Sequence, residues 1–305
     1  MNKNDDSIIV GHSARANNYA KQMILQKYII LDKIGNGKFG TVYRGKYIKT
    51  GETVAIKMEN TKTSHKMLKH ETTILKYLYD HDCRQIPLVH WFGPYNENLC
   101  LVMSYYDCSL YDYCVGDKLN PSKIDKIMEG CVRSLEIIHT HFVIHRDVKP
   151  QNFMLASGSL YMIDFGLATF YIDENHTHVA DTGSQDCIIG TPKYASYHIH
   201  DGKKPSRRDD LISLGYMYIY LHCRELHWDS INTSASSPLY DDINLLNEKN
   251  VKRKELKEWE TIKTTCANIN EPFYRYMEYC YRLKYADLPN YAALCQLFLD
   301  AIANI

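Results

Sequence analysis

Residues 145–152 read HRDVKPQN, and residues 163–166 read IDFG. The two strings bring four polar side chains into one short stretch of chain: Asp147, Lys149, Asn152 and Asp164. Two acids, an amine and an amide are the groups needed to move a phosphoryl group from ATP and magnesium to a hydroxyl. A glycine-rich stretch and a VAIK string precede them in the order that this chemistry requires, so we interpret the four motifs together.

Each of the four side chains has an expected role in that chemistry. Asp147 is expected to orient the substrate hydroxyl and accept its proton, and Lys149 to neutralise the phosphoryl group in transfer. Asn152 and Asp164 supply amide and carboxylate oxygens, the ligands that the hard cation Mg²⁺ prefers. The sequence therefore predicts catalytic residues at all four positions and a magnesium site at Asn152 and Asp164.

Residues 35–42 fit the pattern GxGxxGxV, whose glycines let the backbone approach phosphates closely. The shorter pattern GxGxxG also marks dinucleotide sites, but there a helix follows the glycines, whereas here the motif lies between two predicted strands. The predicted nucleotide-binding stretch comprises Ile34, Gly35, Asn36, Gly37, Lys38, Phe39, Gly40, Thr41 and Val42.

Lys57 closes the string VAIK at the end of a predicted strand. A lysine in this position can reach the α- and β-phosphates of ATP if a carboxylate holds its ammonium in place. Glu71, in the predicted helix that follows, is the expected partner, and Glu59 is the weaker competitor. Lys57 and Glu71 are therefore counted among the predicted catalytic residues.

Hydrophobic patterning divides the chain into a strand-rich part and a helix-rich part. Short apolar alternations from Tyr28 onward predict an antiparallel sheet, with one helix at residues 66–79. After residue 105, helical spacing dominates. We expect an α+β, bilobal fold, with a polar extension over 1–27 and a single domain over 28–300, divided into an N-lobe at 28–104 and a C-lobe at 105–300. The polar stretch 229–254 is expected to include a surface loop.

Composition excludes several other classes of protein. Of 305 residues, 45% are hydrophobic, and 36 basic residues balance 36 acidic ones, so no global charge favours nucleic acid or an anionic membrane. No apolar run approaches the ~20 residues that span a bilayer, and the N-terminus lacks the apolar core of a signal peptide. We expect an intracellular monomer, cytoplasmic or nuclear, whose ten cysteines are reduced, since no CxxC pair occurs.

Further strings give the chain a specific resemblance. They are GTPKYAS at 190–196, SRRDDL at 206–211, SLGY at 213–216, LVM at 101–103, PNY at 289–291 and QLF at 296–298. Together with the motifs above, they resemble the casein kinase 1 family of eukaryotic-type serine/threonine protein kinases over about residues 28–300. The resemblance implies an enzyme that uses ATP and Mg²⁺ to phosphorylate Ser or Thr hydroxyls of proteins.

The resemblance also implies roles for individual residues. Met103 corresponds to the gatekeeper, and Ser104, Tyr105 and Tyr106 to the hinge that binds adenine through its backbone. The residues implied to pack on the adenine are Ala55, Met154 and Ile163. Asp210 is implied to hold the backbone of the catalytic loop from a buried helix, and Lys149 with Thr191 implies Ser/Thr specificity.

Some positions depart from the pattern of that family. Lys193 stands where an anion-binding arginine is usual, and the basic cluster expected after the His227-Trp228 turn is replaced by Asp229. A preference for acidic or pre-phosphorylated substrates is therefore left open. Two other functions are also left open: a pseudokinase that binds partners without catalysis, and a kinase of small molecules with the same fold.

Overall fold

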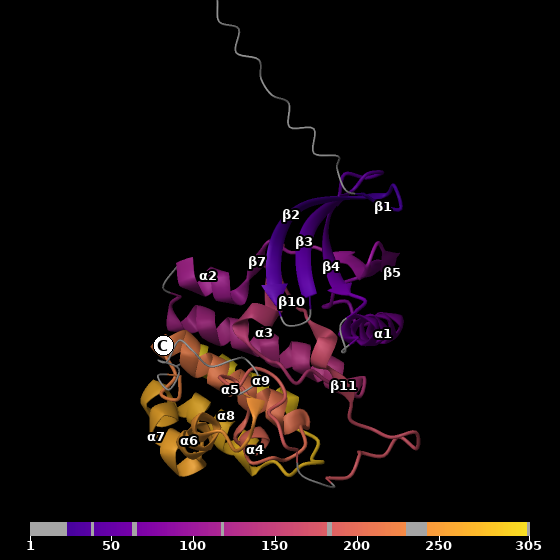
Figure 1. The fold of residues 1–305 in the computed structure, drawn as a ribbon. Coiled ribbons are helices and arrows are strands. Elements are labelled where there is room, and N and C mark those ends of the chain that lie inside the picture. Colours follow the sequence, from indigo (N-terminus) through magenta and orange to yellow (C-terminus); the bar gives the residue numbers. More distant parts are fainter. Residues whose placement is uncertain are drawn as a thin grey trace, which may run out of the picture.

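The structure is a computed structural model, and it describes residues 23–37, 40–62, 66–116, 119–181, 185–229 and 243–303. Figure 1 shows a sheet with one helix packed beside it above a larger group of helices. The predicted α+β, bilobal fold is confirmed.

Antiparallel strands of the described residues form a six-stranded sheet in the order β1-β2-β3-β4-β6-β5. The strands are β1 Met23–Ile24, β2 Tyr28–Gly37, β3 Gly40–Tyr47, β4 Thr53–Asn60, β5 Val89–Tyr95 and β6 Asn98–Ser104. The central strand β4 is buried on both faces: Val54 and Ile56 pack into one apolar cluster, while Ala55 belongs to the main core. Side chains alternate along a strand, so Lys57 lies on the same face as Ala55.

The sheet begins at Met23 rather than at Tyr28. β1 pairs with β2, and Ile24 is fully buried among the strands. Leu25 and Gln26 both have positive φ and turn the chain back at once. Met23 and Ile24, expected within the polar extension, are therefore part of the sheet, and residues 25–27 form the turn into β2. Two residues are too short a strand to give a recognisable alternation.

The helix α1 (Met67–Asp80) packs beside the sheet through Leu68, Ile74, Leu75 and Leu78. Its start is fixed by the neighbouring strand, because Glu59 on β4 accepts the backbone N–H of Leu68 at 2.8 Å. An oxygen from another element thus satisfies one of the N–H groups that lack a partner within the helix. Glu59 is therefore occupied with the helix end.

The lower lobe is built from helices around α5. Its helices are α2 Leu110–Gly116, α3 Pro121–Thr140, α4 Tyr197–His200, α5 Arg207–Cys223, α6 Glu248–Leu256, α7 Trp259–Ile269, α8 Glu271–Arg282 and α9 Tyr291–Ala303. Five short strands form two further small sheets, β10-β9-β7 and β11-β8: β7 Cys108–Ser109, β8 Val143–Ile144, β9 Phe153–Ala156, β10 Ser159–Met162 and β11 Thr169–Phe170. α5 is buried along almost its whole length, so the surrounding helices enclose it.

The stretch 229–254, expected to include a surface loop, lies only partly within the described residues. Residues 230–242 lie outside the described part, but α6 begins at Glu248, inside the stretch expected to include a loop. α6 buries polar rather than apolar side chains, with Asn250 fully buried and Arg253 2% exposed. A helix that buries polar groups has no apolar stripe, and hydrophobic periodicity cannot find it.

Within the described residues, no helix is both long and apolar enough to cross a membrane. All ten cysteines have free thiols, and seven of them are buried: Cys83, Cys100, Cys114, Cys131, Cys266, Cys280 and Cys295.

The contact of α5 with α8 requires glycine at position 215. A Cβ at Gly215 would lie 2.0 Å from Sδ of the buried Met277. We expect Gly215→Ala to lower the free energy of unfolding by about 1–3 kcal/mol, the usual cost of overpacking, as measured by denaturant unfolding. Gly130→Ala on α3 is the control, because its Cβ would meet only Leu160 at 3.9 Å. Equal stability of the two variants would contradict this packing.

Candidate active site

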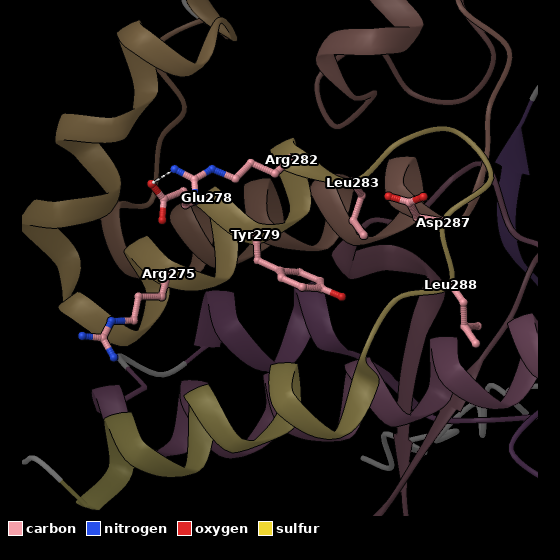
Figure 2. A pocket seen from close by; sticks show the side chains of 7 residues that line it. All are labelled: Arg275, Glu278, Tyr279, Arg282, Leu283, Asp287 and Leu288. Carbon is pink, nitrogen blue, oxygen red and sulfur yellow. Dashed lines mark hydrogen bonds and ion pairs between the residues drawn. The ribbon is translucent and has the colours of Figure 1, made fainter.

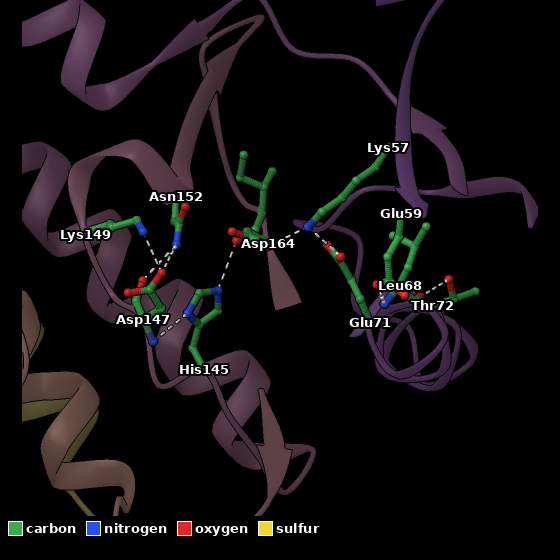
Figure 3. A network of polar contacts seen from close by, with 11 residues as sticks. Lys57, Glu59, Leu68, Glu71, Thr72, His145, Asp147, Lys149, Asn152 and Asp164 are labelled. Atoms are coloured by element: carbon green, nitrogen blue, oxygen red, sulfur yellow. Dashed lines mark hydrogen bonds and ion pairs between the residues drawn. The ribbon is translucent and has the colours of Figure 1, made fainter. Parts of the chain in front are cut away.

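The ammonium of Lys57 lies between two carboxylates (Figure 3). Its Nζ donates to Oε2 of Glu71 at 2.7 Å and to Oδ1 of Asp164 at 2.8 Å. Glu71 comes from α1, and Asp164 follows β10 in the lower lobe. The expected contact of Lys57 with Glu71 is confirmed, and the same ammonium joins the sheet, the helix and the lower lobe.

Burial sets the electrostatics of this triad. Although burial disfavours the charged ammonium, attraction to Glu71 and Asp164 outweighs it and raises the pKa of Lys57 above its ordinary value. Burial also favours the neutral form of Asp164, but the charge of Lys57 dominates and lowers the pKa of Asp164. Burial raises the pKa of Glu71, the more enclosed of the two carboxyls. The Lys57 ammonium and the Asp164 carboxylate are thus charged at neutral pH.

Asp164 has left-handed backbone geometry, with φ 64° and ψ 67°. A residue other than glycine adopts this conformation at a cost, and the neighbouring contacts hold it there. The N–H of Ile163 donates to the carbonyl of Asn152 at 2.9 Å, and Nε2 of His145 contacts the carbonyl of Ile163 at 3.0 Å. The HRD and DFG strings are thereby tied together, although His145 was not among the predicted site residues.

Asp147 is oriented by three neighbours. Its Oδ2 accepts from Nζ of Lys149 at 2.6 Å. Its Oδ1 accepts both the backbone N–H of Thr191 at 2.9 Å and the Thr191 hydroxyl at 2.7 Å. Nδ2 of Asn152 donates to the Asp147 carbonyl at 2.8 Å. The structure thus brings together Asp147, Lys149 and Asn152, as expected, and adds Thr191 from a segment about forty residues farther along the chain.

Asp210, near the start of α5, holds the catalytic loop from below, as the sequence resemblance implied. Its carboxylate accepts the backbone N–H groups of His145 at 2.7 Å and Arg146 at 2.8 Å. Nε2 of the buried His139 contacts the same carboxylate at 3.0 Å. Arg146 has φ 67°, so these contacts hold another strained residue in place.

The side chain of Arg146 forms a hydrogen bond within the protein. Its Nε donates to the backbone carbonyl of Leu167, just after the DFG string. Gly190 approaches the same loop from the other side: it has φ +91°, and a Cβ there would lie 2.4 Å from the Arg146 carbonyl. The segment that carries Thr191 can come this close to the catalytic loop only because residue 190 is glycine.

The glycine-rich motif is a hairpin between β2 and β3, which excludes the strand-to-helix arrangement of a dinucleotide site. Gly35 pairs with Val42, Asn36 with Thr41, and Gly37 with Gly40. Of the predicted stretch, Ile34 precedes this pairing on β2, and Lys38 and Phe39 lie outside the described residues.

The residues expected around the adenine come from adjacent elements. Ala55 and Met103 face each other across β4 and β6, while Met154 lies on β9 and Ile163 just after β10. The N–H of Ser104 donates to the Leu88 carbonyl at 3.0 Å, and the N–H of Leu88 donates to the Ser104 hydroxyl at 3.2 Å, so the chain is held just ahead of the half-buried Tyr105. The side chains expected to contact adenine therefore belong to both lobes.

The donor set fits a hard divalent cation. Nδ2 of Asn152 donates hydrogen bonds to Asp147, so the amide oxygen of Asn152 takes no part in those bonds. Asp164 uses Oδ1 toward Lys57, and its side chain is 28% exposed, which leaves a carboxylate edge toward the cleft. A carboxylate and an amide oxygen, joined by phosphate oxygens of a nucleotide, form a ligand set typical of Mg²⁺.

A separate cavity of about 490 Å³ lies on α8 and the loop after it (Figure 2). Its lining residues are Arg275, Glu278, Tyr279, Arg282, Leu283, Asp287 and Leu288. None of the predicted site residues lines it, and Arg282 is paired with Glu278 at 2.9 Å. We assign this cavity no part in the chemistry of the cleft.

Comparison with protein families gives one finding. A family model described as the protein kinase domain matches residues 28–287. The matched stretch contains every predicted site residue and both lobes except β1 and α9.

Replacing Asp210 tests whether its carboxylate holds the catalytic loop. In Asp210→Asn, the amide nitrogen would face an N–H donor, leaving one buried group unsatisfied. We expect the free energy of unfolding to fall by about 2 kcal/mol, measured by denaturant titration. Asp300→Asn, on the exposed side of α9, is the control. If both variants kept the stability of the parent protein, Asp210 would have no such role.

Proposed function

This chain belongs to the protein kinase family, and we propose that it is an ATP- and Mg²⁺-dependent serine/threonine kinase that resembles casein kinase 1. The observation that carries the proposal is the network around Asp147, in which Lys149 and Thr191 both contact the carboxylate. It faces the triad of Lys57, Glu71 and Asp164 across the same cleft (Figure 3).

ATP would bind between the lobes, with its adenine near Ala55, Met103, Met154 and Ile163 and its phosphates under the glycine-rich hairpin. Lys57 would be the cation that meets those phosphates, and Glu71 would keep it in place if Asp164 bound a metal. Asn152 and Asp164 would hold the metal, whose charge stabilises the phosphoryl group in transfer.

Asp147 would accept a hydrogen bond from the substrate hydroxyl and take up its proton. Thr191 and Lys149 fix the two carboxylate oxygens, so the acid is oriented before the substrate arrives. Lys149 would also contact the transferring phosphoryl group. A lysine at this position and a threonine at 191 support Ser/Thr as the acceptor, following the resemblance to casein kinase 1.

The substrate surface beside Thr191 does not offer a free cation at position 193. Nζ of Lys193 lies 2.6 Å from Oδ2 of Asp229 and 4.3 Å from the ring centre of Tyr220. The internal carboxylate reduces the attraction that Lys193 would exert on an acidic or phosphorylated substrate. We infer that such substrates gain little from Lys193.

Two alternative functions receive less support. A pseudokinase lacks one or more groups of the transfer machinery, whereas here Lys57, Asp147 and Asp164 are all present and in mutual networks. A kinase of small molecules has no need of the 190–196 segment, which here contacts the catalytic acid directly.

The proposal is tested by phosphate transfer from ATP to casein and to a library of Ser-, Thr- and Tyr-containing peptides. We expect transfer to Ser and Thr, and in Asp164→Asn a fall of about 1000-fold, because the metal loses its carboxylate. Sugars and aminoglycosides serve as parallel acceptors. Nucleotide binding without transfer to any peptide would contradict the proposal, as would transfer to small molecules alone.

Removal of divalent metal tests the site at Asn152 and Asp164. We expect chelation to abolish transfer and Mg²⁺ or Mn²⁺ to restore it, because oxygen donors favour these ions. The folded protein should keep its unfolding temperature without nucleotide, since Lys57 already neutralises Asp164. Undiminished transfer in excess chelator would rule out the metal role.

A further inference from the structure

Lys257 is a fully buried lysine just after α6. Its Nζ donates to three backbone carbonyls of one segment: Ala195 at 2.7 Å, Pro192 at 2.9 Å and Lys193 at 3.3 Å. The amine has at most three N–H donors, so this segment alone can satisfy it. One side chain thus fastens the chain just after Thr191 at several points.

The surroundings of this amine are aromatic rather than acidic. The ring centres of Tyr216 and Trp228 lie 5.0 and 5.1 Å from Nζ, and Nε2 of His200 lies 3.0 Å away. Burial lowers the pKa of Lys257 well below its ordinary value. A buried amine without a bonded carboxylate is costly, so its carbonyl contacts must offset much of that cost.

Both ends of Lys257 are anchored in the helical lobe. Its own carbonyl accepts from the hydroxyl of Tyr281 on α8 at 2.7 Å, and this hydroxyl also contacts that of Tyr216 on α5. Nε1 of Trp228 donates to the Lys193 carbonyl at 2.7 Å, so the same segment is held from a second direction. Through Lys257, the segment is thereby linked to α8 and α5.

The fastened segment leads directly to the catalytic acid. Pro192 follows Thr191, whose N–H and hydroxyl hold Oδ1 of Asp147. The N–H groups of Tyr194 and Ala195 both donate to the Thr191 carbonyl, closing the segment into a turn. A shift of the turn would carry Thr191 with it and release Asp147.

We propose that Lys257 is a positioning residue, which fixes residues 191–195 so that Thr191 holds Asp147 in its productive orientation. The predicted effect of Lys257 on phosphate transfer rests on the proposed kinase function. The structural part of the inference does not, because the contacts from Lys257 to Thr191 can be followed without any substrate.

Hydrogen exchange of the backbone amides tests the structural part. In Lys257→Met, we expect the backbone amides of Thr191, Tyr194 and Ala195 to exchange at least about tenfold faster, because the turn loses its anchor. The amides of His145 and Arg146, held by Asp210, should keep their protection. Unchanged protection at 191–195, or equal loss at both sites, would overturn the proposal, since general destabilisation would move both.

Two further variants complete this experiment. Ile262→Ala removes a buried side chain of α7 that is not bonded to the segment, and it should produce no selective loss at 191–195. Lys257→Gln keeps an N–H donor, so the amides in 191–195 should retain more protection from exchange than in Lys257→Met. If the methionine variant does not fold, Lys257→Gln replaces it in the experiment. Equal protection in both Lys257 variants would contradict a role for the donated hydrogen bonds.

A double-mutant comparison tests the effect on the reaction. Thr191→Val removes the hydroxyl that contacts Asp147, and Lys257→Met should act through the same contact. We expect each single change to lower kcat for a peptide by about 10- to 100-fold. The kcat of the double variant should be close to that of the less active single variant, because both changes act through the same contact. Multiplying losses would show that Lys257 acts elsewhere. If the parent enzyme transfers no phosphate, the proposed function fails, while hydrogen exchange still decides the position of the segment.

Discussion

The rest of the site depends on the ammonium of Lys57, which is shared between Glu71 and Asp164. Lys57 itself lies on β4, and its two partners come from α1 and from the strained residue after β10, so one charge joins sheet, helix and lower lobe. A buried ammonium needs such partners, because an unpaired charge away from water is very costly. The pairing therefore holds β4, α1 and the residue after β10 together, and under the proposed function it also places a cation for the phosphates.

Buried polar groups have the same organising part in the lower lobe. Asp210 holds the backbone of the catalytic loop, and Lys257 holds the backbone of residues 191–195. In both cases a charged or polar side chain reaches main-chain groups that are in no helix or sheet. Irregular backbone needs such partners when it is buried, and the two loops meet at Asp147. The position of Asp147 thus depends on two anchors, Asp210 on α5 and Lys257 just after α6.

Much of the fold and the transfer machinery could be predicted from the sequence. Alternating apolar residues predicted the sheet, and the spacing in the HRDVKPQN string predicted that Lys149 and Asn152 lie beside Asp147. The contacts that sequence reasoning missed have no local pattern: α6 buries polar side chains, and Lys257 reaches carbonyls over sixty positions away. Lys193 and Asp229 are likewise paired only in space. Such contacts follow from the tertiary arrangement, which periodicity and spacing do not encode.

Arg146 already donates to the Leu167 carbonyl, and Thr191 already holds Asp147, so the transfer groups are assembled without a phosphorylated loop. The most direct measurement is rapid-quench transfer by enzyme that carries no phosphate, mixed with MgATP and a Ser/Thr peptide. The expected result is transfer from the first turnover, without a lag. A lag that shortens as the enzyme phosphorylates itself, or no transfer at all, would contradict the account.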